Sequence, residues 1–139
     1  MIADAFLDTN VLVYAAIGHR SERPKYERAR ELIATVDYCT SAQVLAEFYV
    51  NVIKHADVSL SEAKAAEWIA TISLKPCQEV DSGIVMRGIE NSQRYGISYW
   101  DGAIVAAAER LGASTVYSED LNHGQHYGAV QVLNPFISH

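Results

Sequence analysis

The chain has 139 residues, a formal net charge of −6 at pH 7, and a composition of 50% hydrophobic and 20% charged residues. This length and composition predict one globular domain that folds without disulfides or a structural metal, and they exclude a disordered or collagen-like chain. Charged residues interrupt every long apolar stretch, so no membrane span is predicted, and the acidic balance gives no argument for nucleic-acid binding.

Short apolar runs alternate with longer amphipathic stretches along the chain. In the first half of the chain they predict a strand at 3–7, helices at 11–17 and 24–36, a strand at 38–40 and a helix at 42–55. A further helix opens with a capping box at 59–62 and ends at 72, and a strand follows at 77–80. The rest of the chain predicts helices at 82–95 and 98–112, a strand at 114–117, a polar loop at 118–128 and a strand at 130–133. Pro24 suits the first turn of its helix, and Gly96 is a candidate left-handed cap.

Strands separated by helical stretches predict βα units and a mainly parallel sheet that helices cover on both faces. In such sheets the functional crevice lies beyond the carboxyl ends of the strands. The residues that follow the strands are therefore the most informative, and they lie at 8–10, 41–47, 81 and 118–120.

Acidic residues stand close to this predicted crevice, namely Asp8, Glu47, Asp101 and the pair Glu119 and Asp120. Each has an ordinary structural explanation as a helix cap, a solvated helix face or a turn. Their joint placement around one crevice is the stronger indication of function.

Clustered carboxylates are costly, because two unit charges 4 Å apart repel by about 4 kcal/mol at an effective dielectric constant of 20. The cluster is tolerable if a cation joins the groups or if some of them stay protonated. Oxygen-only ligands select Mg²⁺ or Mn²⁺ over zinc. An ion held by few protein ligands keeps bound waters, and one of these can become a nucleophile. These residues leave open whether one ion or two would bind.

Four segments in register resemble a PIN-domain nuclease: FLDTNVLVY at 6–14, AEFY around Glu47, SYWDGAIVAAA around Asp101 and VYSEDLNHG around Asp120. The resemblance extends to NPF at 134–136, and the size suits a stand-alone toxin of the VapC type. It implies a single PIN domain over residues 1–139, a PIN-like α/β/α sandwich with a central, mainly parallel sheet flanked by helices.

The same resemblance implies metal-dependent endonucleolytic cleavage of RNA, with Mg²⁺ or Mn²⁺ as cofactor and products that carry a 5′ phosphate and a 3′ hydroxyl. Asp8, Glu47 and Asp101 match the catalytic, metal-binding acids of the family. Asp120 matches the fourth acid, although Glu119 beside it is an alternative at that position. The matching supporting residues are Thr9, Asn10, Ser118 and Glu119.

Basic residues gather within positions 20–30, where interleaved glutamates make a solvated helix face at least as good an interpretation as an RNA-binding edge. The candidate contacts to RNA phosphates are Arg20, Arg23, Lys25 and Arg28. Aromatic residues near Asp101 can stack on unpaired bases, but for Trp100 packing in the core is the favoured interpretation.

The resemblance also implies a homodimer and a separately encoded antitoxin, through which the chain would reach operator DNA only indirectly. Cys39 and Cys77 are too few for a disulfide framework or a zinc site, and Asp4 and Asp8 interrupt the only apolar start. We therefore expect a cytoplasmic protein whose partners are RNA and the antitoxin, without a membrane.

Other classes of function remain open. Another Mg²⁺-dependent phosphoryl-transfer hydrolase would also place an aspartate after the first strand, but a haloacid-dehalogenase-like phosphatase needs a second aspartate where this chain has Asn10. A response-regulator receiver needs a lysine after the last strand, and 130–136 contains none. The remaining alternatives are a PIN-domain RNA-processing nuclease that is not a toxin and a non-catalytic module whose acids only cap helices. A capping role predicts a stability loss of about 0.5–2 kcal/mol when Asp8 is replaced, whereas a metal role predicts lost activity without lost stability.

Overall fold

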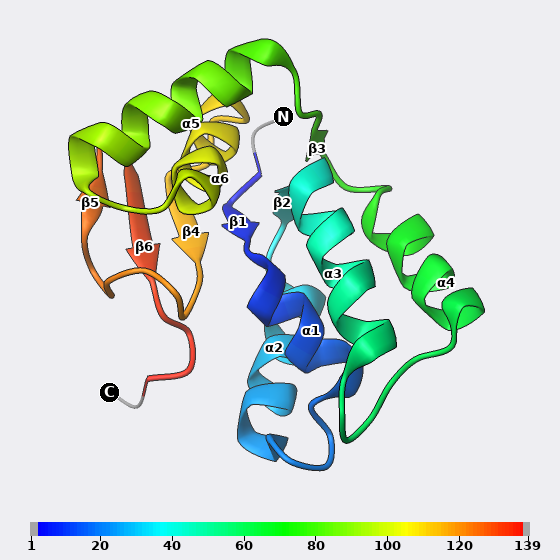
Figure 1. Cartoon of the computed structure of the whole chain (residues 1–139). Helices are drawn as coiled ribbons and strands as arrows, with labels where there is room; N and C mark the ends of the chain where they lie inside the picture. Colours follow the sequence, from blue (N-terminus) through cyan, green and yellow to red (C-terminus); the bar gives the residue numbers. More distant parts are fainter. Residues whose placement is uncertain (1–2, 138–139) are drawn as a thin grey trace.

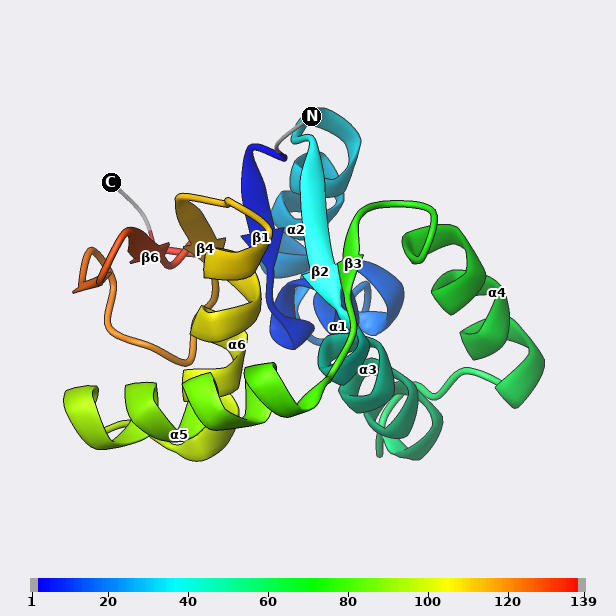
Figure 2. The same ribbon diagram turned by 90° about the horizontal axis from the view of Figure 1, so that it is seen from above.

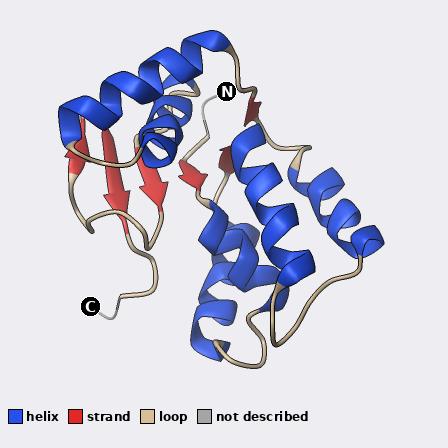
Figure 3. Ribbon diagram, in the orientation of Figure 1, coloured by secondary structure: helices blue, strands red, loops and turns tan. Residues whose placement is uncertain are grey.

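The computed structural model of the chain describes residues 3–137 (Figures 1 and 3). Its elements, in chain order, are β1 (Ala5–Leu7), α1 (Thr9–Ile17), α2 (Arg23–Thr35), β2 (Tyr38–Ser41), α3 (Ala42–Lys54), α4 (Glu62–Ile72), β3 (Cys77–Gln78), α5 (Ser82–Tyr95), α6 (Tyr99–Arg110), β4 (Thr115–Tyr117), β5 (His126–Tyr127) and β6 (Val130–Leu133). Two helices separate each strand from the next between β1 and β4, as the predicted pattern of strands separated by helical stretches requires.

The strands form one sheet in the order β3-β2-β1-β4-β6-β5. All neighbouring strands are parallel except β5, which pairs antiparallel with β6 at the edge. The carboxyl ends of β1, β4 and β6 therefore point in the same direction, as the arrows in Figure 1 show. The backbone N–H of Asp8 donates to the carbonyl of Tyr117 over 3.1 Å, so the residues that follow β1 and β4 start out side by side.

Helices flank the sheet, with α5 packed on α6 along one side (Figure 2), α1 packed on α2 and α3, and α4 packed on α3. The core is formed by the fully buried strand β1 and by the small side chains of α6 from Gly102 to Ala108. Gly102 permits the close approach of α5, because a Cβ atom there would lie 2.4 Å from the carbonyl oxygen of Gly88. This contact fixes the first turn of α6, which carries Asp101.

Several local predictions are confirmed. Gly96 ends α5 with a left-handed φ of 64°, and Pro24 lies in the first turn of α2. Ser41 caps α3 by accepting a hydrogen bond from the N–H of Val44. The N-terminal helix begins two residues earlier than predicted, at Thr9, because Asp8 itself is the cap.

Other local predictions are wrong. The capping box at 59–62 does not form, because Leu60 is held to the end of α3 by a bond from its N–H to the carbonyl of Val52, and Ser61 caps α4 instead. The predicted polar loop at 118–128 contains the short strand β5, whose two residues are too few to show an alternating pattern. The strand predicted at 77–80 extends only from Cys77 to Gln78.

Over residues 3–137, none of the helices combines the length and the apolar character that crossing a bilayer requires.

Candidate active site

Asp8 is a buried carboxylate with only 4% of its surface exposed. One oxygen accepts a hydrogen bond from the N–H of Thr9 at 2.7 Å, and the other accepts from the hydroxyl of Ser118 at 2.7 Å. Burial raises the pKa of Asp8 to about 6 against the opposing effect of these two bonds, and repulsion from Asp120 and Glu47 raises it further. Asp8 therefore caps α1, as one interpretation predicts. Its ionised form is also disfavoured by burial and by the neighbouring acids.

The turn after β4 is joined to α1 by Asn10. The side-chain amide of Asn10 donates to Asp120 at 3.2 Å and to the hydroxyl of Ser118 at 3.3 Å, while its carbonyl accepts from the N–H of Glu119 at 3.4 Å. The hydroxyl of Ser118 also accepts from the N–H of Asp120 at 3.1 Å. Asn10 and Ser118 together hold Asp120 close to Asp8, and their supporting role in a metal site stays a prediction.

Glu119 turns away from Asp120 and belongs to a different set of contacts. Its carboxylate accepts from the hydroxyl of Tyr14 at 2.5 Å and from Nζ of Lys25 at 3.0 Å. Lys25 also lies over the rings of Tyr14 and Phe136, at 5.0 and 5.8 Å from their centroids. We call Tyr14, Lys25 and Glu119 the paired cluster. Because Glu119 is engaged there, Asp120 is the residue of the pair that faces the other acids.

Asp101 and Glu47 complete the set of acids from the helical side. Asp101 lies in the first turn of α6, where its N–H donates to the hydroxyl of Ser98 at 3.1 Å. Burial raises the pKa of Asp101, and the charge of Asp120 adds to this shift. Glu47 accepts from the amide of Gln43 at 2.9 Å. Because Asp120 acts on Asp8 and on Asp101, and Glu47 acts on Asp8, we call these four residues the acidic cluster.

Within residues 3–137, no lysine or arginine forms an ion pair with a member of the acidic cluster. The same part of the chain also contains no group of three Asp, Glu, His or Cys side chains spaced to hold a metal ion. Mg²⁺ is commonly bound through one or two carboxylates while waters fill the rest of its shell. The oxygen-only donor set therefore fits a hydrated, hard cation and does not fit a closed protein cage.

A hollow of about 290 Å³ opens between α1 and α3 beside these acids, and we call it the α1–α3 hollow. It is lined by Thr9, Asn10, Val13, Tyr14, Glu47, Asn51, His55 and Asp120. The hydroxyl of Thr9 is buried without a hydrogen-bond partner among the described residues. An orphaned hydroxyl next to carboxylates is a place where a bound water can complete the hydrogen bonding.

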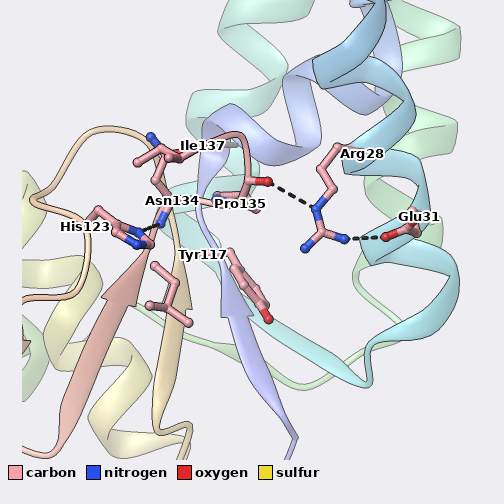
Figure 4. A pocket seen from close by; sticks show the side chains of 8 residues that line it. Arg28, Glu31, Tyr117, His123, Asn134, Pro135 and Ile137 are labelled. Atoms are coloured by element: carbon pink, nitrogen blue, oxygen red, sulfur yellow. Dashed lines mark hydrogen bonds and ion pairs between the residues drawn. The ribbon is translucent and has the colours of Figure 1, made fainter. Parts of the chain in front are cut away.

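A larger hollow, of about 540 Å³, lies between α2 and the segment that follows β6. Figure 4 shows Arg28 and Glu31 on one side of it and Asn134, Pro135 and His123 on the other. The Nε of Arg28 donates to the carbonyl of Pro135 at 3.1 Å. No member of the acidic cluster lines this hollow, so its size does not make it the candidate active site.

The basic residues predicted to contact RNA are largely engaged with acids. Arg23 pairs with Glu27 and Arg28 with Glu31 on the surface of α2, and Lys25 belongs to the paired cluster. Arg20 lies exposed in the turn before α2. Neutralised pairs attract phosphates weakly, so these contacts favour the interpretation of α2 as a solvated helix face.

Sequence reasoning missed several residues around the site. Tyr14 follows Asn10 by one helical turn, and this spacing could have placed both on the same face of α1. Asn51 lies four residues after Glu47 on α3, and His55 lies four residues further on at the C-cap of this helix; both line the α1–α3 hollow. The prediction that Trp100 packs in the core is wrong, because 63% of its surface is exposed.

The sequence of residues 5–128 matches the family described as PIN domain. This match covers most of the chain, and the chain therefore belongs to the PIN domain family. No curated protein matches the chain at a significant level.

Solved structures show the same fold. The toxin VapC20 of Mycobacterium tuberculosis, described as cleaving the sarcin–ricin loop, has 19% identity and a TM-score of 0.66 over 84% of this chain and 89% of its own. FitAB bound to a DNA fragment gives 22% identity and a TM-score of 0.71 over 97% of both chains. A toxin–antitoxin complex from Klebsiella pneumoniae gives 17% identity and a TM-score of 0.69 over 94% of this chain and 97% of its own. At these identities the likeness concerns the fold.

Proposed function

We propose that this chain is a metal-dependent endoribonuclease and the toxin of a type II toxin–antitoxin pair. The acidic cluster carries the proposal, because a PIN domain here holds Asp8 at a raised pKa against Asp120 and Glu47 without a compensating cation. The similar structures of a ribosomal-loop-cleaving toxin and of toxin–antitoxin complexes support it.

In this proposal the acidic cluster, Asp8, Glu47, Asp101 and Asp120, holds a hydrated Mg²⁺ or Mn²⁺, with some of its carboxylates acting through bound waters. When bound, such an ion lowers the pKa of a coordinated water and stabilises charge on a phosphoryl oxygen. The residues around the acids keep them in place. Ser118 and the N–H of Thr9 orient Asp8, and Asn10 orients Asp120. The hydroxyl of Thr9 is available to a water in the α1–α3 hollow.

The proposed partners are a cognate antitoxin and a second copy of the chain, in the cytoplasm. An antitoxin that places a basic side chain beside the acidic cluster would compete with the metal ion for the same negative charge. The exposed side chains of Val85, Met86 and Ile89 on α5 offer apolar surface to a second copy. Operator DNA would be reached through the antitoxin, as the DNA-bound VapBC complexes of Rickettsia felis and Salmonella typhimurium suggest.

The test is cleavage of single-stranded RNA by the purified protein in Mg²⁺, in Mn²⁺ and in EDTA. We expect cleavage only with a divalent cation, products with 5′ phosphate ends, and no cleavage by Asp8→Asn or Asp101→Asn. Asp81→Asn is the matched control, because Asp81 also caps a helix, accepting from the N–H of Ile84 at 2.8 Å, and lies outside the acidic cluster.

Cleavage that persists in EDTA and in Asp8→Asn would overturn the proposed mechanism. Absence of cleavage under every metal condition, with a folded wild-type protein, would favour a binding module whose acids only cap helices. Growth arrest on expression of the wild type, relieved by Asp8→Asn, would separate a toxin from a housekeeping RNA-processing nuclease.

A further inference from the structure

Trp100 is the exposed aromatic residue next to the acidic cluster. It immediately precedes Asp101 in the first turn of α6, and 63% of its surface is exposed. Its ring meets that of Tyr99 edge-on, with the centroids 5.1 Å apart and the planes at 74°. A single exposed aromatic side chain is ordinary on a protein surface, and it is the position of Trp100 next to the acidic cluster that makes it a candidate for binding.

Gln43 links the backbone of Trp100 to the acidic cluster. The amide of Gln43 donates to the carboxylate of Glu47 at 2.9 Å and to the carbonyl of Trp100 at 3.2 Å. A single side chain therefore links the backbone that carries the ring to a member of the acidic cluster. This bridge fixes the start of α6 against the second turn of α3.

A hollow of about 280 Å³ lies at this ring, and we call it the Trp100 hollow. Its lining is mostly small and apolar: Ala42, Gln43, Ala46, Glu47, Val80, Tyr99 and Trp100. The volume is near the lower limit of the about 300–1,000 Å³ of small-molecule pockets, which suits one planar base better than a bulky ligand.

Glu47 lines both the Trp100 hollow and the α1–α3 hollow. Glu47 thus borders both a hollow with an aromatic ring and a polar hollow that offers Asn10, Asn51 and His55. Proteins that bind single-stranded nucleic acid combine these two features, because bases stack on aromatic faces while the polar backbone follows a separate track.

We propose that Trp100 is a stacking platform for an unpaired base next to the phosphodiester that is cut, with the strand crossing the acids into the α1–α3 hollow. The inference rests on the proposed function and deepens it, since it restricts the substrate to RNA whose bases are unpaired at the site. Trp100 and Glu47 line the same hollow, and this position next to the acidic cluster favours RNA over a second protein chain as the occupant.

The test measures binding of fluorescein-labelled, random-sequence single-stranded RNA of about 16 nucleotides by anisotropy, in an Asp8→Asn background that prevents cleavage. Trp100→Phe should keep the dissociation constant within a small factor, whereas Trp100→Ala and Trp100→Leu should raise it about 5- to 150-fold, the equivalent of the about 1–3 kcal/mol of one stacked base. Leu74→Ala is the control, because Leu74 is 86% exposed and does not line either hollow.

A second readout uses the fluorescence of the ring itself. The chain contains two tryptophans, so Trp68→Phe leaves Trp100 as the only reporter. Single-stranded RNA should quench its emission in a saturable way, and the same strand annealed to its complement should quench much less. If the Trp68 substitution impairs folding, the anisotropy measurements of the Trp100 variants still test whether the ring binds RNA.

The proposal is overturned if Trp100→Leu binds RNA as well as Trp100→Phe does, or if RNA leaves the emission unchanged. It is also overturned if the emission shifts on dilution without RNA while sedimentation shows a dimer dissociating, because a second copy then covers the ring. RNA cleavage, measured with chains that keep Asp8, separates the two proposals. If wild type and Trp100→Leu cut RNA equally well, only the stacking proposal fails, and if the wild type never cuts RNA, the proposed function itself fails.

Discussion

Glu119 and Asp120 are neighbours in the chain, yet their carboxylates lie in opposite electrostatic surroundings. Glu119 belongs to the paired cluster, where Lys25 and the hydroxyl of Tyr14 offset its charge. Asp120 belongs to the acidic cluster, and among residues 3–137 its carboxylate accepts a hydrogen bond only from the neutral amide of Asn10. The proposed cation site accounts for this contrast, because a bound cation would supply the positive charge that the paired cluster receives from Lys25.

This comparison predicts substitutions with opposite effects on the two sides of the turn. Neutralising an acid in the paired cluster should cost stability and spare the chemistry. Neutralising an acid in the acidic cluster should spare or raise stability and abolish the chemistry.

The largest expected effect concerns activity. Asp8→Asn and Asp120→Asn should each lower the rate of RNA cleavage by about 10²-fold or more, since each removes charge that stabilises the reacting phosphate through the metal ion. Glu67→Gln, which removes an exposed acid on α4, should cleave at the wild-type rate. Rates are measured by gel under single-turnover conditions, and equal rates for Asp120→Asn and Glu67→Gln would remove Asp120 from the site.

The second effect is a pH dependence of stability in EDTA. The pKa of Asp8 is about 6 in the folded chain and about 3.8 when exposed, so between these values the folded state keeps a proton that the unfolded state releases. The free energy of unfolding should therefore fall as pH rises from about 4 to 6, by up to about 3 kcal/mol, at about 1.36 kcal/mol per pKa unit. Urea unfolding at several pH values measures this slope, and Asp8→Asn should flatten it. A wild-type slope equal to that of the variant would contradict the raised pKa.

The third effect is the stability of Asp8→Asn itself at pH 7.5 without metal. The amide can still accept from the N–H of Thr9, and it removes the repulsion from Asp120 and Glu47. The variant should be about 1–3 kcal/mol more stable than the wild type. Asp81→Asn should instead lower stability, because the pKa of Asp81 is lowered by its hydrogen bond from Ile84 and its contact with Arg110. If both variants lose stability alike, Asp8 is only a helix cap.

The smallest effect concerns the paired cluster. Glu119→Gln should lower the free energy of unfolding by about 0.5–1.5 kcal/mol, because the Lys25–Glu119 pair is only 34% and 23% exposed and Tyr14 also donates to it. Glu67→Gln is the control, since its pair with Lys64 is about 70% exposed and should contribute almost nothing. Identical unfolding midpoints for the two variants would show that the paired cluster does not hold the turn.

The sequence predicts the mainly parallel sheet well, because its helices and strands carry local patterns and caps such as Gly96 and Ser41. It also predicts that acids gather at one crevice, since the ends of parallel strands share an edge. It does not show which of Glu119 and Asp120 faces that crevice. That choice depends on Lys25, which is 94 residues away in the chain.

The exposure of Trp100 is a second feature that local pattern does not reveal. A tryptophan in a helix with many small apolar residues resembles a core residue, and only the packing of α6 against α5 and the sheet shows that its ring remains outside. The short strand β5 was missed for a related reason, because its two residues form a strand only through their pairing with β6.

The central claim is that the acidic cluster is a cation site, and thermal unfolding of wild type and Asp8→Asn with EDTA or millimolar Mg²⁺ or Mn²⁺ tests it most directly. Binding to the folded state must raise its stability. The midpoint of the wild type should rise by about 3 °C or more once the ion exceeds its dissociation constant about tenfold, and the midpoint of Asp8→Asn should not move. Equal responses of the two proteins, or no response of either up to tens of millimolar metal, would contradict the claim and leave helix capping as the explanation of Asp8.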